Sequence, residues 1–152
     1  MEYKNNILQE LRKFAAASRE LTESQVLHLT SSNQDLTALF KKLTKVDLEI
    51  LSSLTENLRI KDLTEKIDFT QSAISKAVKR LENLNLVNRL TNQNNKKEFF
   101  IERTEIGQQL AEIRAQYRAE MNARFDQLVV KFDEKELKTI EKFLTEINKN
   151  VY

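Results

Sequence analysis

The order of segments between Arg59 and Gly107 constrains the fold of this 152-residue chain more than any other feature. Apolar residues recur there first at helical spacing, in two runs separated by a short turn, and then in alternation, as in strands. The helical runs cover residues 62–67 and 70–84, the strands cover 86–90 and 98–103, and the polar segment TNQNNKK at 91–97 joins the strands. Two helices followed by a hairpin predict a winged helix-turn-helix.

The chain is almost free of residues that interrupt helices. It has no proline and a single glycine, Gly107, so we expect a mainly α fold with a small β-hairpin. Thr44 and Thr70 each precede an apolar periodic segment and can cap it by accepting a hydrogen bond from an amide that follows. Asn85 stands where the second helix ends, and asparagine tolerates the left-handed conformation that closes many helices.

Amphipathic helices flank this region on both sides. We expect one helix over residues 4–30 with a weaker middle at 15–18, a shorter helix over 35–43, a third that begins after Thr44, a long helix from Thr104 to about Phe132 and a last helix over 134–150. Ile60 is expected as a brief extended residue. The chain then divides into an N-terminal dimerisation segment (1–43), a DNA-binding domain (44–103) and C-terminal dimerisation helices (104–152).

The terminal helices carry more apolar residues than one narrow stripe requires. They can pack on one another within one chain or intertwine with a second copy. We expect a homodimer, because a two-fold pair matches a palindromic DNA site and places two recognition helices about one duplex turn apart. The residues expected in the dimer interface are Ile7, Leu11, Phe14, Leu128, Phe132, Leu137, Ile140, Leu144 and Ile147.

Positive charge gathers on the second helix of the pair and on the hairpin. Residues 70–97 hold six cations and one acid, a net charge of +5, whereas the whole chain carries +2. A charge run is often only a solvated face, but this one lies on a helix whose Ile74, Val78 and Leu81 face inward. The residues expected to contact double-stranded DNA are Thr70, Gln71, Ser72, Ala73, Ser75, Lys76, Lys79, Arg80, Lys96 and Lys97.

Position along the helix separates base contacts from backbone contacts. The N-terminal turn points at base edges, where Gln71 can pair with adenine and Ser72 or Ser75 can bond a base or a phosphate. Lys79 and Arg80 lie further along and are expected to fix the register on the phosphate backbone. For Gln71 and each serine, a solvated or capping side chain is an equal alternative.

The chain lacks the residues that other classes of function need. The absence of cysteine excludes disulfides, thiolate zinc sites and thiol redox sensing, and the single histidine, His28, cannot fill a zinc site. There is no phosphate-binding glycine loop and no nucleophile motif, so we expect neither an enzyme nor a cofactor or metal. No segment resembles a membrane span or a signal peptide, which predicts a soluble cytoplasmic protein.

Two other functions stay open at this point. One is a helical protein-interaction module whose basic face binds an acidic partner. The other is an architectural DNA binder that tolerates any sequence. Both would use the same cations without reading bases.

Several strings between Leu43 and Leu110 resemble, in order and spacing, the MarR family of bacterial transcription regulators. They are LT at 43–44 with IL at 50–51, SAISK at 72–76, RLE at 80–82 with LVNR at 86–89, and TEIG at 104–107. The resemblance implies a homodimer on a pseudo-palindromic operator, usually a repressor, and often one released by a small-molecule effector. The implied effector crevice can be lined by Phe14, Phe40, Leu54, Tyr117 and Phe125, although the same spacing suits plain core.

The hairpin departs from the family pattern. The family's wing carries an aspartate, any residue, then an arginine that enters the minor groove, whereas this chain has Asn95-Lys96-Lys97. A lysine cannot fork onto two acceptors, and the missing aspartate removes an ion pair that braces the wing. We therefore expect a looser wing that contacts phosphate and reads little sequence. Arg103 stands where the family usually has an apolar residue.

Overall fold

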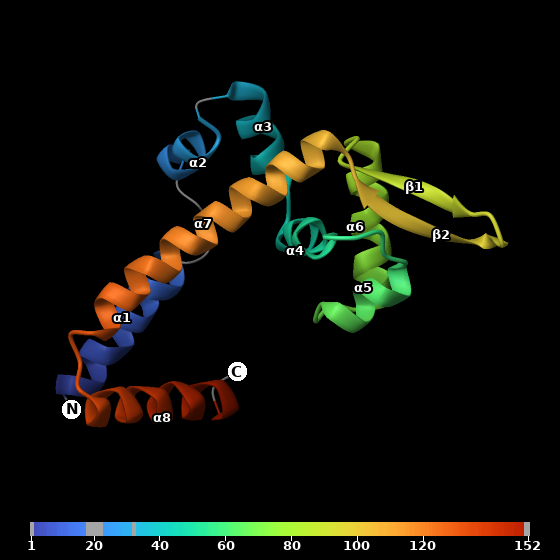
Figure 1. The fold of residues 1–152 in the computed structure, drawn as a ribbon. Helices are drawn as coiled ribbons and strands as arrows, with labels where there is room; N and C mark the ends of the chain where they lie inside the picture. Colours follow the sequence, from blue (N-terminus) through green and yellow to red (C-terminus); the bar gives the residue numbers. More distant parts are fainter. Residues whose placement is uncertain (1, 18–22, 32, 151–152) are drawn as a thin grey trace. The chain divides into compact units, whose positions relative to one another are not determined.

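The computed structural model describes residues 2–17, 23–31 and 33–150, which are mainly helical with one antiparallel hairpin, as predicted (Figure 1). The elements are α1 (Glu2–Ala17), α2 (Glu23–Leu29), α3 (Gln34–Lys42), α4 (Lys45–Ser53), α5 (Ile60–Lys66), α6 (Gln71–Asn83), β1 (Val87–Asn92), β2 (Asn95–Arg103), α7 (Glu105–Val129) and α8 (Glu134–Asn150). The chain divides into two compact units, residues 1–113 and 114–152, and α7 runs unbroken through the boundary.

The core of the first unit lies where α4, α5, α6, the hairpin and the start of α7 meet. One fully buried side chain from each of these elements marks it: Ile50, Leu63, Ile74, Ile101 and Leu110. Each such side chain contributes roughly 1.5–3 kcal/mol by leaving water. The predicted inward face of α6 is confirmed, since its buried residues are Ile74, Ala77, Val78 and Leu81.

Local capping signals are also confirmed. The Thr44 hydroxyl accepts a hydrogen bond from the Asp47 amide, and the Asp47 carboxylate accepts one from the Thr44 amide, which closes a capping box at the start of α4. Thr70 caps α6 by accepting from the Ala73 amide at 3.2 Å. Asn85 has a φ of 56°, the left-handed value expected of it.

The hairpin is longer, and its turn shorter, than the sequence predicts. The two strands pair from Val87 opposite Arg103 out to Asn92 opposite Asn95, with an irregularity between Thr91 and Asn92. The predicted seven-residue turn at 91–97 is therefore wrong, because Gln93 and Asn94 alone connect the strands. The distal part of the hairpin covers no core, so its strands need no alternating apolar residues and can be made of polar ones.

A third extended segment pairs with the hairpin near its base. Leu58 and Ile101 exchange two backbone hydrogen bonds, with N···O distances of 3.1 and 2.8 Å. Arg59, the next residue, is extended and caps α5, and Ile60 is the first helical residue. The expectation that Ile60 is extended is thus wrong by one position, because the charged pair Arg59 and Asp62 sets the start of the helix.

The root of α7 is fastened to the turn that follows α6. The Thr104 amide donates to the Leu86 carbonyl at 3.1 Å, and the Thr104 hydroxyl donates to the Asn85 carbonyl at 2.8 Å. A Cβ atom at Gly107 would lie 2.0 Å from the Leu86 carbonyl oxygen, so only glycine allows this approach. The short string from Thr104 to Gly107 is therefore a packing joint.

The flanking helices differ from the prediction at their ends. The single helix expected over 4–30 is wrong, because α1 ends at Ala17 and a separate α2 begins at Glu23; residues 18–22 lie outside the described part. Helix α7 ends at Val129 rather than near Phe132. Helix α8 matches the predicted range, and Asp133 and Glu136 cap it reciprocally. None of the described helices has the length and apolar character needed to cross a bilayer.

Candidate nucleic-acid interface

Helix α6 turns a polar face to solvent, opposite the face that it buries in the core. The exposed side chains on it are Gln71, Ser72, Lys76 and Lys79, and Ala73 and Ser75 lie half-buried at its edge. The side chains of Gln71, Ser72 and Ser75 form no hydrogen bond with another described residue, so their polar groups remain open to a ligand. The predicted reading face is therefore assembled on one helix.

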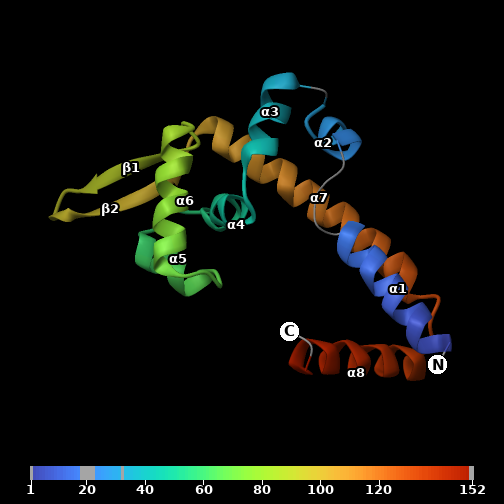
Figure 2. The same cartoon turned by 180° about the vertical axis from the view of Figure 1, so that it is seen from behind.

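Among the described side chains, three lysines of α6 and the hairpin carry positive charge that no ion pair neutralises. Lys76, Lys79 and Lys97 are exposed, and none forms an ion pair with another described residue. The side chain of the predicted Lys96 lies outside the described part. Strand β1 begins next to α6 and extends away from it in both ribbon views, so the hairpin projects from the same body as α6 (Figures 1 and 2).

Arg80 is engaged within the protein. Its Nη2 donates to Asp47 Oδ1 at 2.6 Å and to Thr44 Oγ1 at 3.0 Å, and its Nε donates to Asp47 Oδ2 at 3.0 Å. The Asp47 side chain is fully buried, whereas that of Arg80 is 41% exposed. This forked pair fixes the last turns of α6 to the start of α4. Sequence reasoning placed Arg80 on phosphate and read Asp47 only as part of a helix cap.

Arg89 connects the hairpin to the end of α6. Its Nε donates to Glu82 Oε2 at 2.8 Å, and its guanidinium carbon lies 4.4 Å from the centroid of the Phe99 ring. A cation over an aromatic face adds roughly 0.5–1 kcal/mol at an exposed site. Arg89 is one of the cations counted in residues 70–97, but the carboxylate of Glu82 neutralises its charge.

Arg59 connects the hairpin to α5. It forms two side-chain hydrogen bonds with Asp62, at 3.0 and 2.9 Å, and reaches Glu98 Oε1 at 3.4 Å. Hydrogen bonds from Arg59 lower the pKa of Asp62 to about 2, and the pKa of Arg59 rises above its ordinary value for the same reason. The base of the hairpin is thus held by two ion pairs in place of the missing aspartate: Arg59, at the start of α5, reaches Glu98 of β2, and Arg89 of β1 reaches Glu82 of α6. The looser wing expected from the sequence stays a prediction.

Arg103, which departs from the family pattern, has a structural role. Its Nη1 donates to the Leu51 carbonyl at 3.1 Å, and that carbonyl belongs to the last turn of α4. The last carbonyls of a helix lack helical partners, and a cation there also favours the helix dipole. Arg103 therefore stabilises the end of α4 from the hairpin.

The five residues of the predicted effector crevice divide between the two units, so the crevice stays a prediction. Phe40 and Leu54 are buried in the first unit, which agrees with the alternative that they are ordinary core residues. Phe14, also in the first unit, is 71% exposed. Tyr117 and Phe125 belong to the second unit, and Phe125 is 63% exposed.

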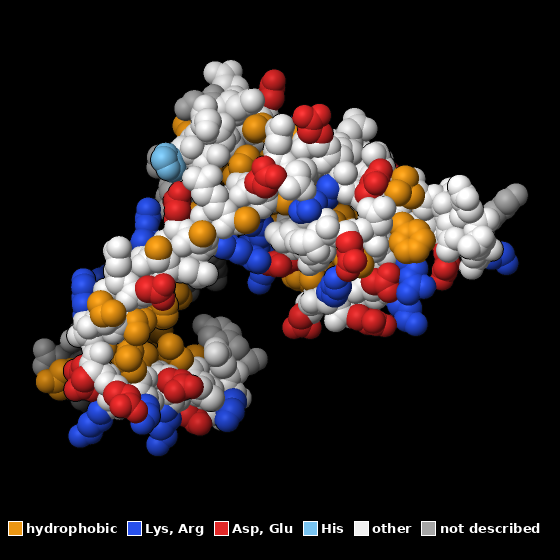
Figure 3. Space-filling model, in the orientation of Figure 1, with side chains coloured by type: hydrophobic (Ala, Val, Ile, Leu, Met, Phe, Trp, Pro, Cys, Tyr) orange, Lys and Arg blue, Asp and Glu red, His pale blue; other side chains and the backbone are white. Residues whose placement is uncertain are grey.

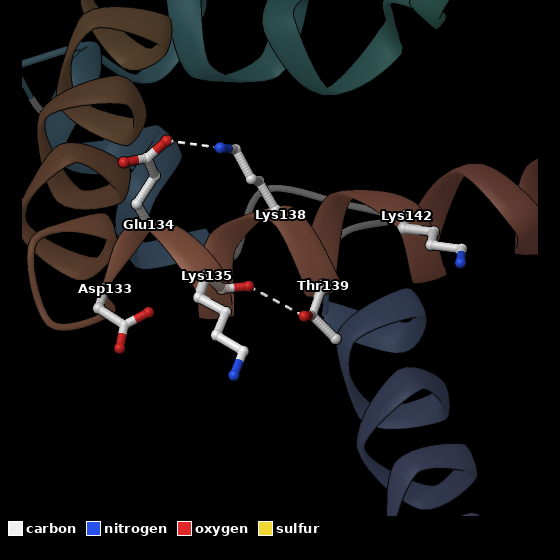
Figure 4. A pocket seen from close by; sticks show the side chains of 6 residues that line it. All are labelled: Asp133, Glu134, Lys135, Lys138, Thr139 and Lys142. Carbon is white, nitrogen blue, oxygen red and sulfur yellow. Dashed lines mark hydrogen bonds and ion pairs between the residues drawn. The ribbon is translucent and has the colours of Figure 1, made fainter.

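A shallow hollow of about 720 Å³ lies instead along the first turns of α8 (Figure 4). Six residues line it: Asp133, Glu134, Lys135, Lys138, Thr139 and Lys142. Lys138 pairs with Glu134 at 2.6 Å, and the Thr139 hydroxyl donates to the Lys135 carbonyl. None of the predicted effector residues lines this hollow.

Among residues 2–17, 23–31 and 33–150, no group of three or more histidine or carboxylate side chains could hold a metal ion. His28, in the last turn of α2, is exposed. The chain has no cysteine that could complete a thiolate site.

Apolar side chains remain uncovered on the terminal helices. No residue of α8 is buried, and Phe125 and Val130 of the second unit are 63% and 82% exposed. Hydrophobic side chains are visible on the surface of this part of the chain in Figure 3. Of the predicted interface residues, Leu11, Leu137 and Ile147 are half-buried and the rest are exposed: Ile7, Phe14, Leu128, Phe132, Ile140 and Leu144. Exposed apolar side chains that gather on a surface often mark a contact with another protein.

Comparison with known proteins identifies the region that contains these features. The model of the MarR family matches residues 43–99. The uncharacterised HTH-type transcriptional regulator YvnA of Bacillus subtilis is 27% identical over 143 residues, which cover 91% of each chain.

Solved structures share the fold over nearly the whole chain. The adhesin competence repressor AdcR of Streptococcus pyogenes is 22% identical, with a TM-score of 0.66 over 99% of this chain and 97% of that one. ZitR of Lactococcus lactis, described as a zinc-responsive member of the MarR family, is 22% identical, with a TM-score of 0.69 over 99% of this chain and 98% of that one.

Proposed function

Residues 43–99 form a DNA-binding domain of the MarR family, and from this premise we propose that the chain is a homodimeric repressor of a pseudo-palindromic operator. The chain is a transcription regulator rather than an enzyme, in keeping with its family and its relatives. Such a regulator acts in the cytoplasm of a bacterial cell, where its operator lies. Repression, the operator and the dimer are the parts of the proposal that need an experiment.

The observation that carries the proposal is that α6 has one face buried in the core and an opposite polar face exposed to solvent. Its apolar face is buried in the core, and its opposite face offers Gln71, Ser72, Lys76 and Lys79 to solvent without side-chain partners among the described residues. A helix held in this way can enter the major groove with its N-terminal residues at base edges. We assign Thr70 to capping α6. We assign Arg80 to holding α6 against α4, and its N–H donors that do not bind Asp47 or Thr44 to a contact with phosphate.

The dimer is supported by the exposed apolar side chains of the terminal helices. Segments 1–43 and 104–152 would supply the contacts, and segment 44–103 would supply the DNA surface. A two-fold pair would place the two α6 helices ~34–36 Å apart, which matches two half-sites on one face of a duplex. The charged variant Leu144→Glu should dissociate the dimer, whereas Lys142→Glu, on the polar side of the same helix, should leave it intact. Sedimentation at micromolar concentration distinguishes these results.

We propose a small organic effector in preference to zinc. AdcR and ZitR share the fold, and ZitR is described as zinc-responsive, but this chain offers one histidine and no cysteine. Zinc sites in proteins usually need four donors of which histidine and cysteine form the majority. A thermal-shift screen that includes zinc and metabolites tests this point, and stabilisation by micromolar zinc alone would overturn it.

Selection of bound sequences from random duplexes tests the function as a whole. The expected result is one enriched motif with two inverted half-sites about one helical turn apart. Binding without sequence preference would favour an architectural protein. Binding that disappears above very low salt would favour a protein-interaction module with a basic face.

A further inference from the structure

Two separate routes attach the root of α7 to α6. The first is the turn that follows α6, where Thr104 donates to the carbonyls of Asn85 and Leu86. Gly107 packs against the same Leu86 carbonyl. Such a turn is one point of attachment, and one point alone would let α6 and α7 rotate about it. A second point is needed to fix the angle between the two helices.

The second route passes through α4 and starts at Arg103, the last residue of β2. Side chains alternate across a strand, so Arg103 lies on the same face as the fully buried Ile101. From there its Nη1 donates to the Leu51 carbonyl, in the last turn of α4, at 3.1 Å. The Leu51 side chain is fully buried, and its Cδ2 atom lies 3.5 Å from the position that a Cβ atom at Gly107 would take. The end of α4 is therefore held by β2 and lies against α7.

The start of α4 is held by α6. Asp47 binds Arg80 through both carboxylate oxygens, at 2.6 and 3.0 Å. Asp47 and Leu51 are four positions apart in one helix, a separation of ~6 Å along its axis. Helix α4 thus connects α6 to the root of α7 over little more than one turn, by contacts that the first route does not use.

We propose that Arg103 is a positioning residue that sets the angle between α6 and the start of α7, acting through α4. The inference rests on the proposed function, because this angle matters only where two α6 helices must reach two half-sites at once. One added base pair moves a half-site by about 3.4 Å along the duplex and by about 35° around it. A dimer with a fixed angle cannot follow that displacement, whereas a dimer with a loose angle can. Arg103 needs no contact with DNA in this role.

A role of Arg103 in stability alone makes a different prediction. A cation that bonds a terminal carbonyl stabilises the helix that it ends. A loss of folded protein would weaken binding to every duplex by the same factor. A change in the tolerated spacing of the half-sites is therefore the readout that separates positioning from stability.

The probes are the duplex that the wild-type protein selects from a random pool and two derivatives, with one base pair inserted or removed between the half-sites. Wild-type protein should bind each derivative at least roughly fivefold more weakly, the loss that one mismatched base pair causes. Arg103→Met keeps an unbranched side chain and lacks the donor. It should bind the selected duplex roughly fivefold more weakly and both derivatives within about twofold of that value, because α6 is then ordered only on binding. A wild-type penalty for altered spacing in Arg103→Met would overturn the inference.

Two further variants serve as controls, each measured well below its unfolding temperature. Arg103→Lys keeps a donor and a positive charge, so it should restore most of the spacing penalty. Thr37→Val removes a buried hydroxyl that bonds Thr30 at 2.6 Å and the Asn33 carbonyl at 2.7 Å, outside α4, α6 and α7. It should unfold at a lower temperature and keep the full spacing penalty. Loss of the penalty in Thr37→Val would tie spacing to stability and contradict the role of Arg103.

A spin label gives a second measurement, on the free dimer. The chain has no cysteine, so Ser72→Cys places one label per subunit on the exposed first turn of α6. The distribution of distances between the two labels should be narrow with Arg103 present and broader with Arg103→Met. Equal widths would show that Arg103 does not restrict α6.

The two levels of the proposal fail in different ways. If wild-type protein selects no pair of inverted half-sites, or if its labels detect no second copy, the proposed function itself is wrong. If the pair is selected and the wild type tolerates either altered spacing, the angle is not fixed. The role of Arg103 is then wrong while half-site recognition by α6 stands.

Discussion

Asp47 and Arg80 form a forked ion pair that joins the first turn of α4 to the last turns of α6, with 2.6 Å between Asp47 Oδ1 and Arg80 Nη2. The carboxylate is fully buried, and the Thr44 amide and hydroxyl also donate to it. The pair therefore holds the recognition helix at a set angle and height on the core. Its energy depends on both partners, because a buried carboxylate without its cation is costly.

Arg80→Ala should destabilise the protein by about 3 kcal/mol, the low end for breaking a buried pair, because Arg80 itself is partly exposed. Urea unfolding measures the change. The neighbouring Lys79 is exposed and has no ion-pair partner in the described part of the chain, so Lys79→Ala should stay within about 0.5 kcal/mol of the wild type. In a double-mutant cycle, Asp47→Ala/Arg80→Ala should cost less than the sum of the single changes, and strict additivity would show that the pair contributes nothing.

Acid should release the pair of Asp62 and Arg59. The folded pKa of Asp62 is lowered from 3.8 to about 2, so its stabilisation is fully present above pH ~4 and is lost as the pH falls through about 2. Asp62→Asn should therefore be less stable than the wild type at neutral pH, and the gap should close between pH 4 and pH 2. Urea unfolding across this range measures it.

The control for this titration is Glu65→Gln, which removes a carboxylate from the same helix without touching Arg59. Its stability should follow the pH dependence of the wild type. If the gap between the wild type and Asp62→Asn stays constant down to pH 2, the ion pair has no linked protonation.

Gly107→Ala should destabilise the protein, although alanine is the better helix former by about 1 kcal/mol. The added Cβ would meet the Leu86 carbonyl oxygen at 2.0 Å, so backbone must move. We expect a net loss of about 1–3 kcal/mol, the usual cost of overpacking. Gln109 is exposed in the same turn, so Gln109→Ala should be neutral or slightly stabilising. A Gly107→Ala variant more stable than the wild type would show that the backbone around Leu86 can move at little cost.

Lys79→Ala and Gln71→Ala should affect DNA binding in different ways. The wild-type dimer should show a salt slope of about −5 to −7, from roughly three or four phosphates per subunit. Lys79→Ala should weaken cognate and scrambled duplexes alike and make the slope shallower. Gln71→Ala should relax preference at one base pair by ~1–3 kcal/mol. Equal losses for Gln71→Ala on cognate and scrambled DNA would remove it from the reading set.

The features that the sequence predicts correctly depend on near neighbours in the chain. Thr70 caps its own helix, Asn85 adopts the left-handed conformation, and Ile74 and Val78 face inward, all within one or two turns of the residue concerned. Such signals are readable because backbone geometry fixes which groups can meet within four residues.

The features that it misses join residues far apart in the chain. Arg80 meets Asp47 across 33 positions and Arg59 meets Glu98 across 39, and a list of charges does not say which cations find partners. The extent of the hairpin was missed for another reason, because TNQNNKK has the composition of a loop and strand pairing overrides that preference.

The close contact between Gly107 and the Leu86 carbonyl leaves no space between the start of α7 and the turn that follows α6. We therefore expect the start of α7, the turn after α6 and the base of the hairpin to shift together when α7 moves. In the proposed dimer, a molecule that bends or turns α7 would change the separation of the two α6 helices and leave the core of each DNA-binding domain unchanged.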